Sequence, residues 1–93
     1  MKEISLERKE RMINSLTCKL PMIRQVMNIS QTELGDMVGL SRQSISSIER
    51  GTSKLSWNNY MAIMMFIVAN LDNYSALLDI NDVNEIIDVL NLK

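Results

Sequence analysis

Start and stop signals for short helices recur along the chain and constrain its fold more than any other feature. Ser30 opens the run SQTE, in which Ser30 and Glu33 can satisfy each other's backbone N–H groups as a capping box. Gly39 then supplies a stop, Ser41 a new N-cap and Gly51 a second stop. No run of alternating β-branched residues and no Asn-Gly hairpin signal interrupts the pattern. The sequence therefore predicts an all-α fold, a compact bundle of about five to six helices.

Further helices are predicted on both sides of this region. Ser5 can cap an amphipathic helix, and Pro21 marks a new start, because proline is tolerated in a first helical turn but not in an interior. The pieces before and after Pro21 are either separate helices, the second over about residues 20–27, or one kinked helix. Downstream, Ser56 can cap a Met-rich helix over 57–69 that is apolar nearly all round. We expect this helix to be central and buried, and to be core rather than a metal or cofactor site.

The C-terminal part predicts a short helical turn followed by a last helix. The turn carries Tyr74, Leu77 and Leu78, and Asn81 or Asp82 can cap the helix that follows. This helix can pack its apolar stripe on its own domain or on a second copy, and the sequence leaves both open. The stripe consists of Val83, Ile86, Ile87 and Leu90.

Composition bounds the class of protein. Of the 93 residues, 46% are apolar, which is enough for one core. The longest apolar run, 61–69, has nine residues, whereas a membrane-spanning helix needs about 20. The lone Cys18 cannot form an internal disulfide, and the first residues are too charged for a signal peptide. A reducing, cytoplasmic setting is therefore expected.

The overall charge conceals an uneven distribution. The formal net charge is −1, yet residues 1–54 carry nine Lys/Arg and six Asp/Glu, and residues 55–93 carry one Lys and five Asp/Glu. The N-terminal part can therefore meet a polyanion while the acidic part faces elsewhere. The ERKER run near the N-terminus is either a solvated surface or an extra contact to DNA or to a second copy.

Small and apolar residues lie at fixed spacings in the centre of the chain. Gln31, Gly35 and Gly39 follow one another at intervals of four. A small residue at 35 lets two helices approach closely, although glycine there should cost about 0.5–1 kcal/mol of helix stability relative to alanine. Gly39 can adopt the positive φ of a tight turn, and Ile45 and Ile48 share one stripe. The preceding helix has an apolar face formed by Leu34, Met37 and Val38.

These positions together resemble a known family. The segment 23–51, IRQVMNISQTELGDMVGLSRQSISSIERG, is similar to the Cro and lambda-repressor-like helix-turn-helix family, also called XRE-type. Asn28, Gly35 and Leu40 depart mildly from the family pattern. The matching positions are Arg24, Ile29, Ser30, Gln31, Leu34, Val38, Gly39, Ser41, Ile45, Ser46, Glu49 and Gly51.

The resemblance implies a lambda-repressor-like helical bundle that contains a helix-turn-helix. It divides the chain into an N-terminal helical extension (1–19), a helix-turn-helix DNA-binding domain (20–69) and C-terminal helices for packing or dimerisation (70–93).

By this resemblance, residues 41–50 form a recognition helix that lies in the major groove with its first residues at the base edges. Arg42 and Gln43 come first, since arginine can bind the O6/N7 edge of guanine and glutamine the N6/N7 edge of adenine. Ser44 and Ser47 share the outward face and can bond to a base or a phosphate.

The same resemblance implies that other side chains bind the DNA backbone or have structural roles. Ser46 stays undecided between the inward and outward faces. Arg24 and Glu49 are expected to form a partly buried salt bridge that ties the first helix to the recognition helix. Phosphate contacts, which set the register without reading sequence, are expected from Gln31, Arg50, Thr52, Ser53 and Lys54.

These features favour a sequence-specific transcriptional regulator, a repressor that binds double-stranded DNA as a homodimer. The resemblance implies a bacterial or phage origin and a place in the cytoplasm, at the nucleoid. The alternative is a DNA-binding antitoxin that holds a protein partner with its acidic C-terminal region, and a tail folded back on its own chain would argue against it. An enzyme is not expected, because the chain has no histidine and its serines have no base arranged as a triad. No cofactor and no metal are expected.

Overall fold

A computed structural model describes residues 4–90, which form helices and no strand. The predicted all-α fold is therefore confirmed. The Cα radius of gyration is 12.5 Å, close to the roughly 12 Å expected of a compact chain of this length. No helix in this part of the chain is both long enough and apolar enough to cross a membrane. The elements in chain order are α1 (Leu6–Met27), α2 (Gln31–Val38), α3 (Arg42–Glu49), α4 (Trp57–Ala69), the 3-10 helix η1 (Ser75–Asp79) and α5 (Asn81–Leu90).

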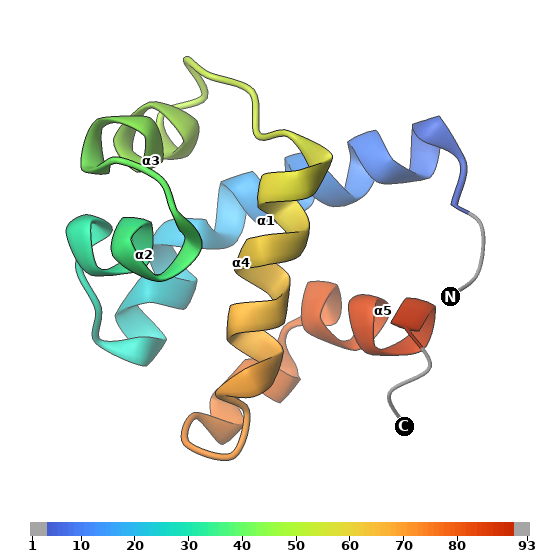
Figure 1. Cartoon of the computed structure of the whole chain (residues 1–93). Helices are drawn as coiled ribbons and strands as arrows, with labels where there is room; N and C mark the ends of the chain where they lie inside the picture. The colour runs from blue at the N-terminus through green and yellow to red at the C-terminus, as the bar shows by residue number, and fades with distance from the viewer. Residues whose placement is uncertain (1–3, 91–93) are drawn as a thin grey trace.

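α1 is a single helix, so the expectation of a new start at Pro21 is wrong and the kinked alternative is the observed one. Pro21 lies inside α1, where its missing N–H leaves the carbonyl of Thr17 without its helical partner. Figure 1 shows the second half of α1 turning away from the direction of the first, as expected at a proline. Leu16, Leu20 and Ile23 are buried on one side of both halves and hold the bent helix on the core.

The division into 1–19, 20–69 and 70–93 stays a prediction. Its first boundary falls inside α1, and its second follows the end of α4. Residues 1–3 and 91–93 of the outer parts lie outside the described residues.

The predicted helix caps and helix stops are found at the predicted positions. Ser30 Oγ accepts from the Glu33 backbone N–H at 3.0 Å and Glu33 Oε1 accepts from the Ser30 N–H at 3.0 Å, which completes the capping box. Ser5, Ser41 and Ser56 cap α1, α3 and α4 by accepting from the backbone N–H groups of Arg8, Ser44 and Asn59. Left-handed residues follow three of the helices, with φ values of 56° at Asn28, 80° at Gly39 and 78° at Gly51.

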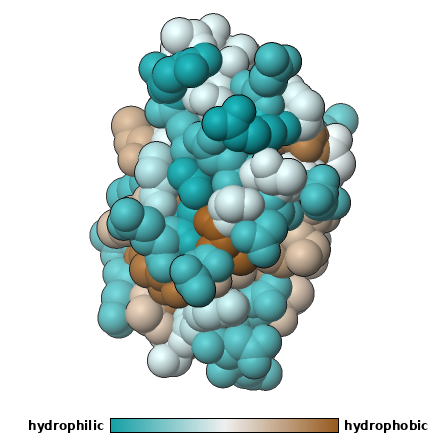
Figure 2. Space-filling view, turned by 90° about the vertical axis from the view of Figure 1, so that its left-hand side faces the viewer, coloured by the Kyte–Doolittle hydropathy of each residue, from teal (hydrophilic) through white to brown (hydrophobic). Residues whose placement is uncertain are grey.

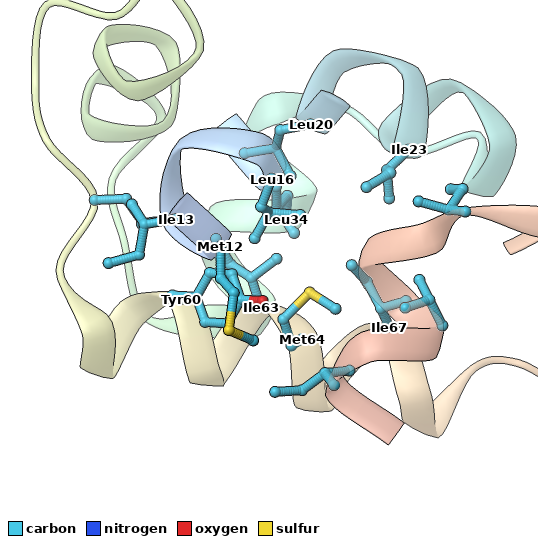
Figure 3. Close-up of a cluster of buried hydrophobic side chains, with 14 of the residues drawn as sticks. Met12, Ile13, Leu16, Leu20, Ile23, Leu34, Tyr60, Ile63, Met64 and Ile67 are labelled. Atoms are coloured by element: carbon cyan, nitrogen blue, oxygen red, sulfur yellow. The ribbon is translucent and has the colours of Figure 1, made fainter. Parts of the chain in front are cut away.

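α4 lies at the centre of the bundle and contacts α1, α2 and α5. Figure 3 shows its side chains Tyr60, Ile63, Met64 and Ile67 lying against those of α1 and against Leu34 of α2. The prediction of a central, buried helix is thus confirmed for one side of α4. Burial is not complete, because Met65 is exposed.

α5 packs on its own chain, which decides between the two arrangements that the sequence left open. It contacts α1, α4 and η1, with Val83, Ile86 and also Val89 buried. The expectation that Asn81 or Asp82 precedes the helix as its cap is wrong, since α5 already begins at Asn81. Asp82 instead pairs with Lys19 of α1.

Two ion pairs fasten α5 to α1, and we call these four residues the α1–α5 clasp. Arg8 donates from Nε and Nη2 to Glu85 Oε2 at 3.1 and 3.0 Å, and Lys19 Nζ lies 2.6 Å from Asp82 Oδ1. Asp82 is the only buried charged residue between residues 4 and 90. The clasp therefore neutralises two cations of α1 with carboxylates of the acidic C-terminal part.

Candidate nucleic-acid interface

α2 and α3 are joined by a very tight turn. Gly39 has φ 80°, and the Leu40 N–H donates to the Gly35 carbonyl at 2.8 Å. A Cβ built on Gly35 would lie 2.3 Å from the Leu40 carbonyl oxygen, so alanine cannot fit without moving backbone. The expected helix penalty at Gly35 is therefore outweighed here, because only glycine permits this approach of the turn.

The buried face of α2 differs from the predicted one. Leu34 and Gly35 are buried, whereas Met37, placed on that face by the sequence, is 63% exposed. Because Gly35 lies on the buried side of α2 together with Leu34, that side is centred away from Met37. The tight turn, rather than apolar character alone, thus decides how α2 is rotated.

α3 is anchored by two isoleucines and presents its opposite side outward. Ile45 is fully buried and Ile48 is 4% exposed. The outward side forms a shallow hollow that is open to solvent, and Figure 2 shows mostly hydrophilic residues on the upper part of this side of the molecule. The hollow is lined by Arg42, Gln43, Ser46, Ser47 and Arg50.

Three of the four predicted base-reading residues share this surface. Arg42 and Gln43 are exposed and Ser47 is half-buried. Ser44 does not line the hollow: its Oγ accepts from the Ser41 hydroxyl at 3.0 Å, at the start of the helix. Ser46, which the sequence left undecided, does line it. The surface can therefore present a guanidinium, an amide and two hydroxyl groups to base edges.

Two of the five predicted phosphate contacts are already engaged inside the chain. Gln31 Nε2 donates to Glu49 Oε1 at 3.0 Å, which leaves one of its two amide hydrogens. Thr52 Oγ1 donates its only hydrogen to the Ser47 carbonyl at 3.1 Å, so it helps to end α3. Arg50, Ser53 and Lys54 remain exposed to solvent.

Arg24 and Glu49 form a nearly buried ion pair that joins α1 to α3. Arg24 Nε lies 2.6 Å from Glu49 Oε2, and Nη2 lies 2.9 Å from Oε1. Their side chains are 18% and 6% exposed. The hydrogen bond to Glu49 raises the pKa of Arg24. Burial opposes ionisation of Glu49, but the hydrogen bonds from Arg24 and Gln31 outweigh it and hold the pKa of Glu49 below its ordinary value.

Two cations without an ion-pair partner lie where α3 faces solvent. Arg8, Lys19 and Arg24 form close ion pairs, while Arg42 and Arg50 form none within residues 4–90, as is also the case for Lys9 and Arg11 of α1. The partly exposed Lys54 lies 3.9 Å from Glu10. The outward face of α3 is therefore a surface on which positive charge is available to an anion.

A second hollow adjoins the segment that follows α3. Asn14 and Thr17 of α1 line it together with residues 51–54. No local sequence signal points to Asn14 or Thr17, because their position here depends on how α1 crosses this segment. Thr17 Oγ1 donates to the Ile13 carbonyl at 2.8 Å, which leaves Asn14 as the free polar side chain from α1 there.

Comparison with known families identifies a helix-turn-helix in the part of the chain that carries this face. A protein-family model described as "Helix-turn-helix" matches residues 22–59. The match confirms, over these residues, the predicted resemblance to the Cro and lambda-repressor-like, XRE-type family. The match covers the end of α1, all of α2 and α3, and the start of α4. Comparison with curated proteins and with solved structures found no match.

Proposed function

We propose that the protein is a sequence-specific transcriptional repressor that reads the major groove with α3. The single observation that carries this proposal is the outward face of α3, where Arg42 and Gln43 stand at the first turn with no partner within residues 4–90. The first residues of a recognition helix lie closest to the base edges. Arginine and glutamine at these positions favour contacts to guanine and adenine.

The order of contacts along the chain supports the same role. Arg50 stands at the end of α3, and Ser53 and Lys54 follow it in an exposed segment. These side chains can bind the sugar-phosphate backbone beside the groove and so fix the register of α3. Repression then follows from occupation of the site, which excludes other proteins from the same DNA.

We further propose that the protein acts as a homodimer. One α3 helix spans only a few base pairs, whereas two related by a two-fold axis read half-sites about 34 Å apart. The alternative role as an antitoxin that holds a partner with the C-terminal region gains no support, because α5 packs on α1, α4 and η1 and buries Val83, Ile86 and Val89 there.

Selection from a pool of duplexes with a randomised centre tests the proposal. We expect the full-length protein to enrich a palindromic sequence and to protect it from cleavage. Arg42→Ala should relax the preference at one position of each half-site, at a cost of about 1–3 kcal/mol. Arg50→Ala, the control for a backbone contact, should weaken binding to all duplexes alike. Equal binding to every duplex in the pool would remove the claim of a sequence-specific regulator.

A further inference from the structure

An apolar hollow lies between the first turns of α1 and the start of α4. It measures about 380 Å³ and is open to solvent. Its apolar lining comes from Leu6, Ile13, Leu55 and Trp57. The hollow lies outside the face of α3, and the part of it that α1 supplies precedes the family match at residues 22–59.

Leu6 projects from the edge of this hollow. It is 73% exposed, more than the other large apolar side chains that reach solvent. Burying such a side chain is worth roughly 1.5–3 kcal/mol, so leaving it in water on a helix surface is unfavourable. The remaining exposed apolar side chains are dispersed over α1, α2, α4 and η1, and none lines the hollow; they are Met22, Met37, Met65 and Leu78.

Charges of both signs surround the hollow. Lys9 Nζ lies 5.1 Å from the centre of the Trp57 ring, and Lys54 Nζ lies 3.9 Å from Glu10 Oε1. Glu10 and Lys54 are both largely exposed, so their mutual attraction is weak. A partner that carries both signs can therefore form pairs with all three residues.

We infer that this surface, formed by Leu6, Lys9, Glu10 and Trp57, is where a second copy of the chain docks. A two-fold interface must be complementary to itself, and here a projecting leucine stands beside a hollow larger than its own side chain. Leu6 of each copy would enter the hollow of the other, and Glu10 of each copy would face Lys9 or Lys54 of the other.

The place of the surface agrees with the proposed function, on which this inference rests. Residues 50–56 connect the end of α3 directly to the hollow at the start of α4.

The mass of the full chain in solution tests the inference directly. Sedimentation over a concentration series should give a monomer–dimer equilibrium. Trp57 is the only tryptophan in the chain, so its fluorescence should shift to shorter wavelength as the dimer forms. A shift that follows the sedimentation curve places the contact at this hollow.

Leu6→Ser is the decisive variant, and Leu78→Ser is its matched control. Both replace an exposed leucine by serine, but Leu78 lies on η1, away from the hollow. Leu6→Ser should raise the dimer Kd about ten-fold or more, and Leu78→Ser should change it less than about two-fold. Circular dichroism checks that both variants keep their helices.

Three results would overturn the inference: a monomer at all concentrations, a Leu6→Ser protein that dimerises as the parent does, or an equal loss in Leu78→Ser. Binding to the selected DNA separates this failure from that of the proposed function. Leu6→Ser should keep its affinity for a duplex with one half-site while losing its preference for the palindrome. A parent protein that binds no duplex overturns the regulator role, and the sedimentation result then stands alone.

Discussion

α1 holds two distant parts of the molecule by ion pairs, but in two different environments. Near its C-terminal end, Arg24 reaches Glu49 of α3, and the two side chains are 18% and 6% exposed. Near its N-terminal end, Arg8 reaches Glu85 of α5, and both of these side chains are more than one-third exposed. The first pair holds α3, the proposed recognition helix, and the second belongs to the clasp that holds the C-terminal helix α5.

The comparison shows why the net charge says little about this protein. In the clasp, acidic residues of the C-terminal part form ion pairs with cations of α1. Arg42 and Arg50 on α3 keep their charge unopposed by any partner within residues 4–90. An overall charge of −1 is therefore compatible with a surface that attracts a polyanion.

The largest difference in the free energy of unfolding is expected between the variants Glu49→Ala and Glu85→Ala. Glu49→Ala leaves Arg24 nearly buried without its carboxylate, and it also removes the acceptor of Gln31. We expect a loss of about 3 kcal/mol in the free energy of unfolding. Glu85→Ala removes the same type of ion pair at a site where water can solvate Arg8 instead. The loss in the free energy of unfolding should therefore stay below about 1 kcal/mol. Urea unfolding of both variants measures the difference, and an unchanged stability in Glu49→Ala would contradict a structural role for the pair.

Acid titration sharpens the same contrast. The pKa of Glu49 lies below its ordinary value in the folded protein, so its contribution to stability is complete above the unfolded pKa, about 4.3. It is lost as the pH falls from there through the folded pKa. The stability of the parent should therefore decrease below about pH 4 more steeply than that of Glu49→Gln. Parallel curves for the two proteins would mean that Glu49 contributes no such dependence.

Gly35→Ala should have the next largest effect on the free energy of unfolding, and it acts at the turn between α2 and α3 only. The added Cβ would meet the Leu40 carbonyl oxygen at 2.3 Å, and the turn must move to relieve the clash. We expect a loss of about 1–3 kcal/mol, which exceeds the gain in helix propensity. Cys18→Ala, at an exposed position of α1, is the control and should stay within about 0.5 kcal/mol. A Gly35→Ala protein more stable than the parent would show that the turn can move at little cost in free energy.

Local signals made much of the fold predictable from the sequence. The capping box at Ser30 and the stop at Gly39 depend on residues within one helical turn. The bounds of α3 could be predicted because the cap at Ser41 and the spacing of Ile45 and Ile48 are local features of the sequence. Arg24 and Glu49 could be paired only because the family resemblance supplied the correspondence.

Contacts between distant elements could not be predicted. Arg8 and Glu85 are 77 residues apart and Lys19 and Asp82 are 63 apart, so nothing local relates them. Continuity through Pro21 depends on a core that holds both halves of α1 in place. The outward position of Ser46 and the local bond of Ser44 depend on how α3 is rotated against its neighbours.

The clasp should respond weakly, and in a salt-dependent manner, to Asp82→Asn. The substitution keeps the shape of the buried side chain but removes the charge that Lys19 faces at 2.6 Å. Since Lys19 is 38% exposed, water can compensate it, and we expect a loss of about 1 kcal/mol at low salt. The loss should shrink as salt screens the pair. Asp79→Asn, at an exposed position of η1, is the control; an equal loss there would deny a specific role to the clasp.

The smallest effect is expected from Tyr60→Phe, where α4 approaches the clasp. The Tyr60 hydroxyl is buried and has no hydrogen-bond partner within residues 4–90. Burial, aided by the charges of Asp82 and Glu85, raises the pKa of Tyr60. Removing an unsatisfied buried hydroxyl should leave the free energy of unfolding unchanged or raise it by up to about 1 kcal/mol.

High pH should enlarge the difference between Tyr60→Phe and the parent. In the unfolded chain the tyrosine ionises near pH 10, whereas in the folded protein it keeps its proton to higher pH. The unfolded parent therefore releases this proton first, and its stability falls as the pH rises above about 10. Tyr60→Phe lacks this contribution and should fall less steeply, although lysines titrate equally in both proteins. Urea unfolding at pH 8 and pH 11 measures the change. A Tyr60→Phe protein that is less stable than the parent at both values would mean that the hydroxyl has a partner in solution.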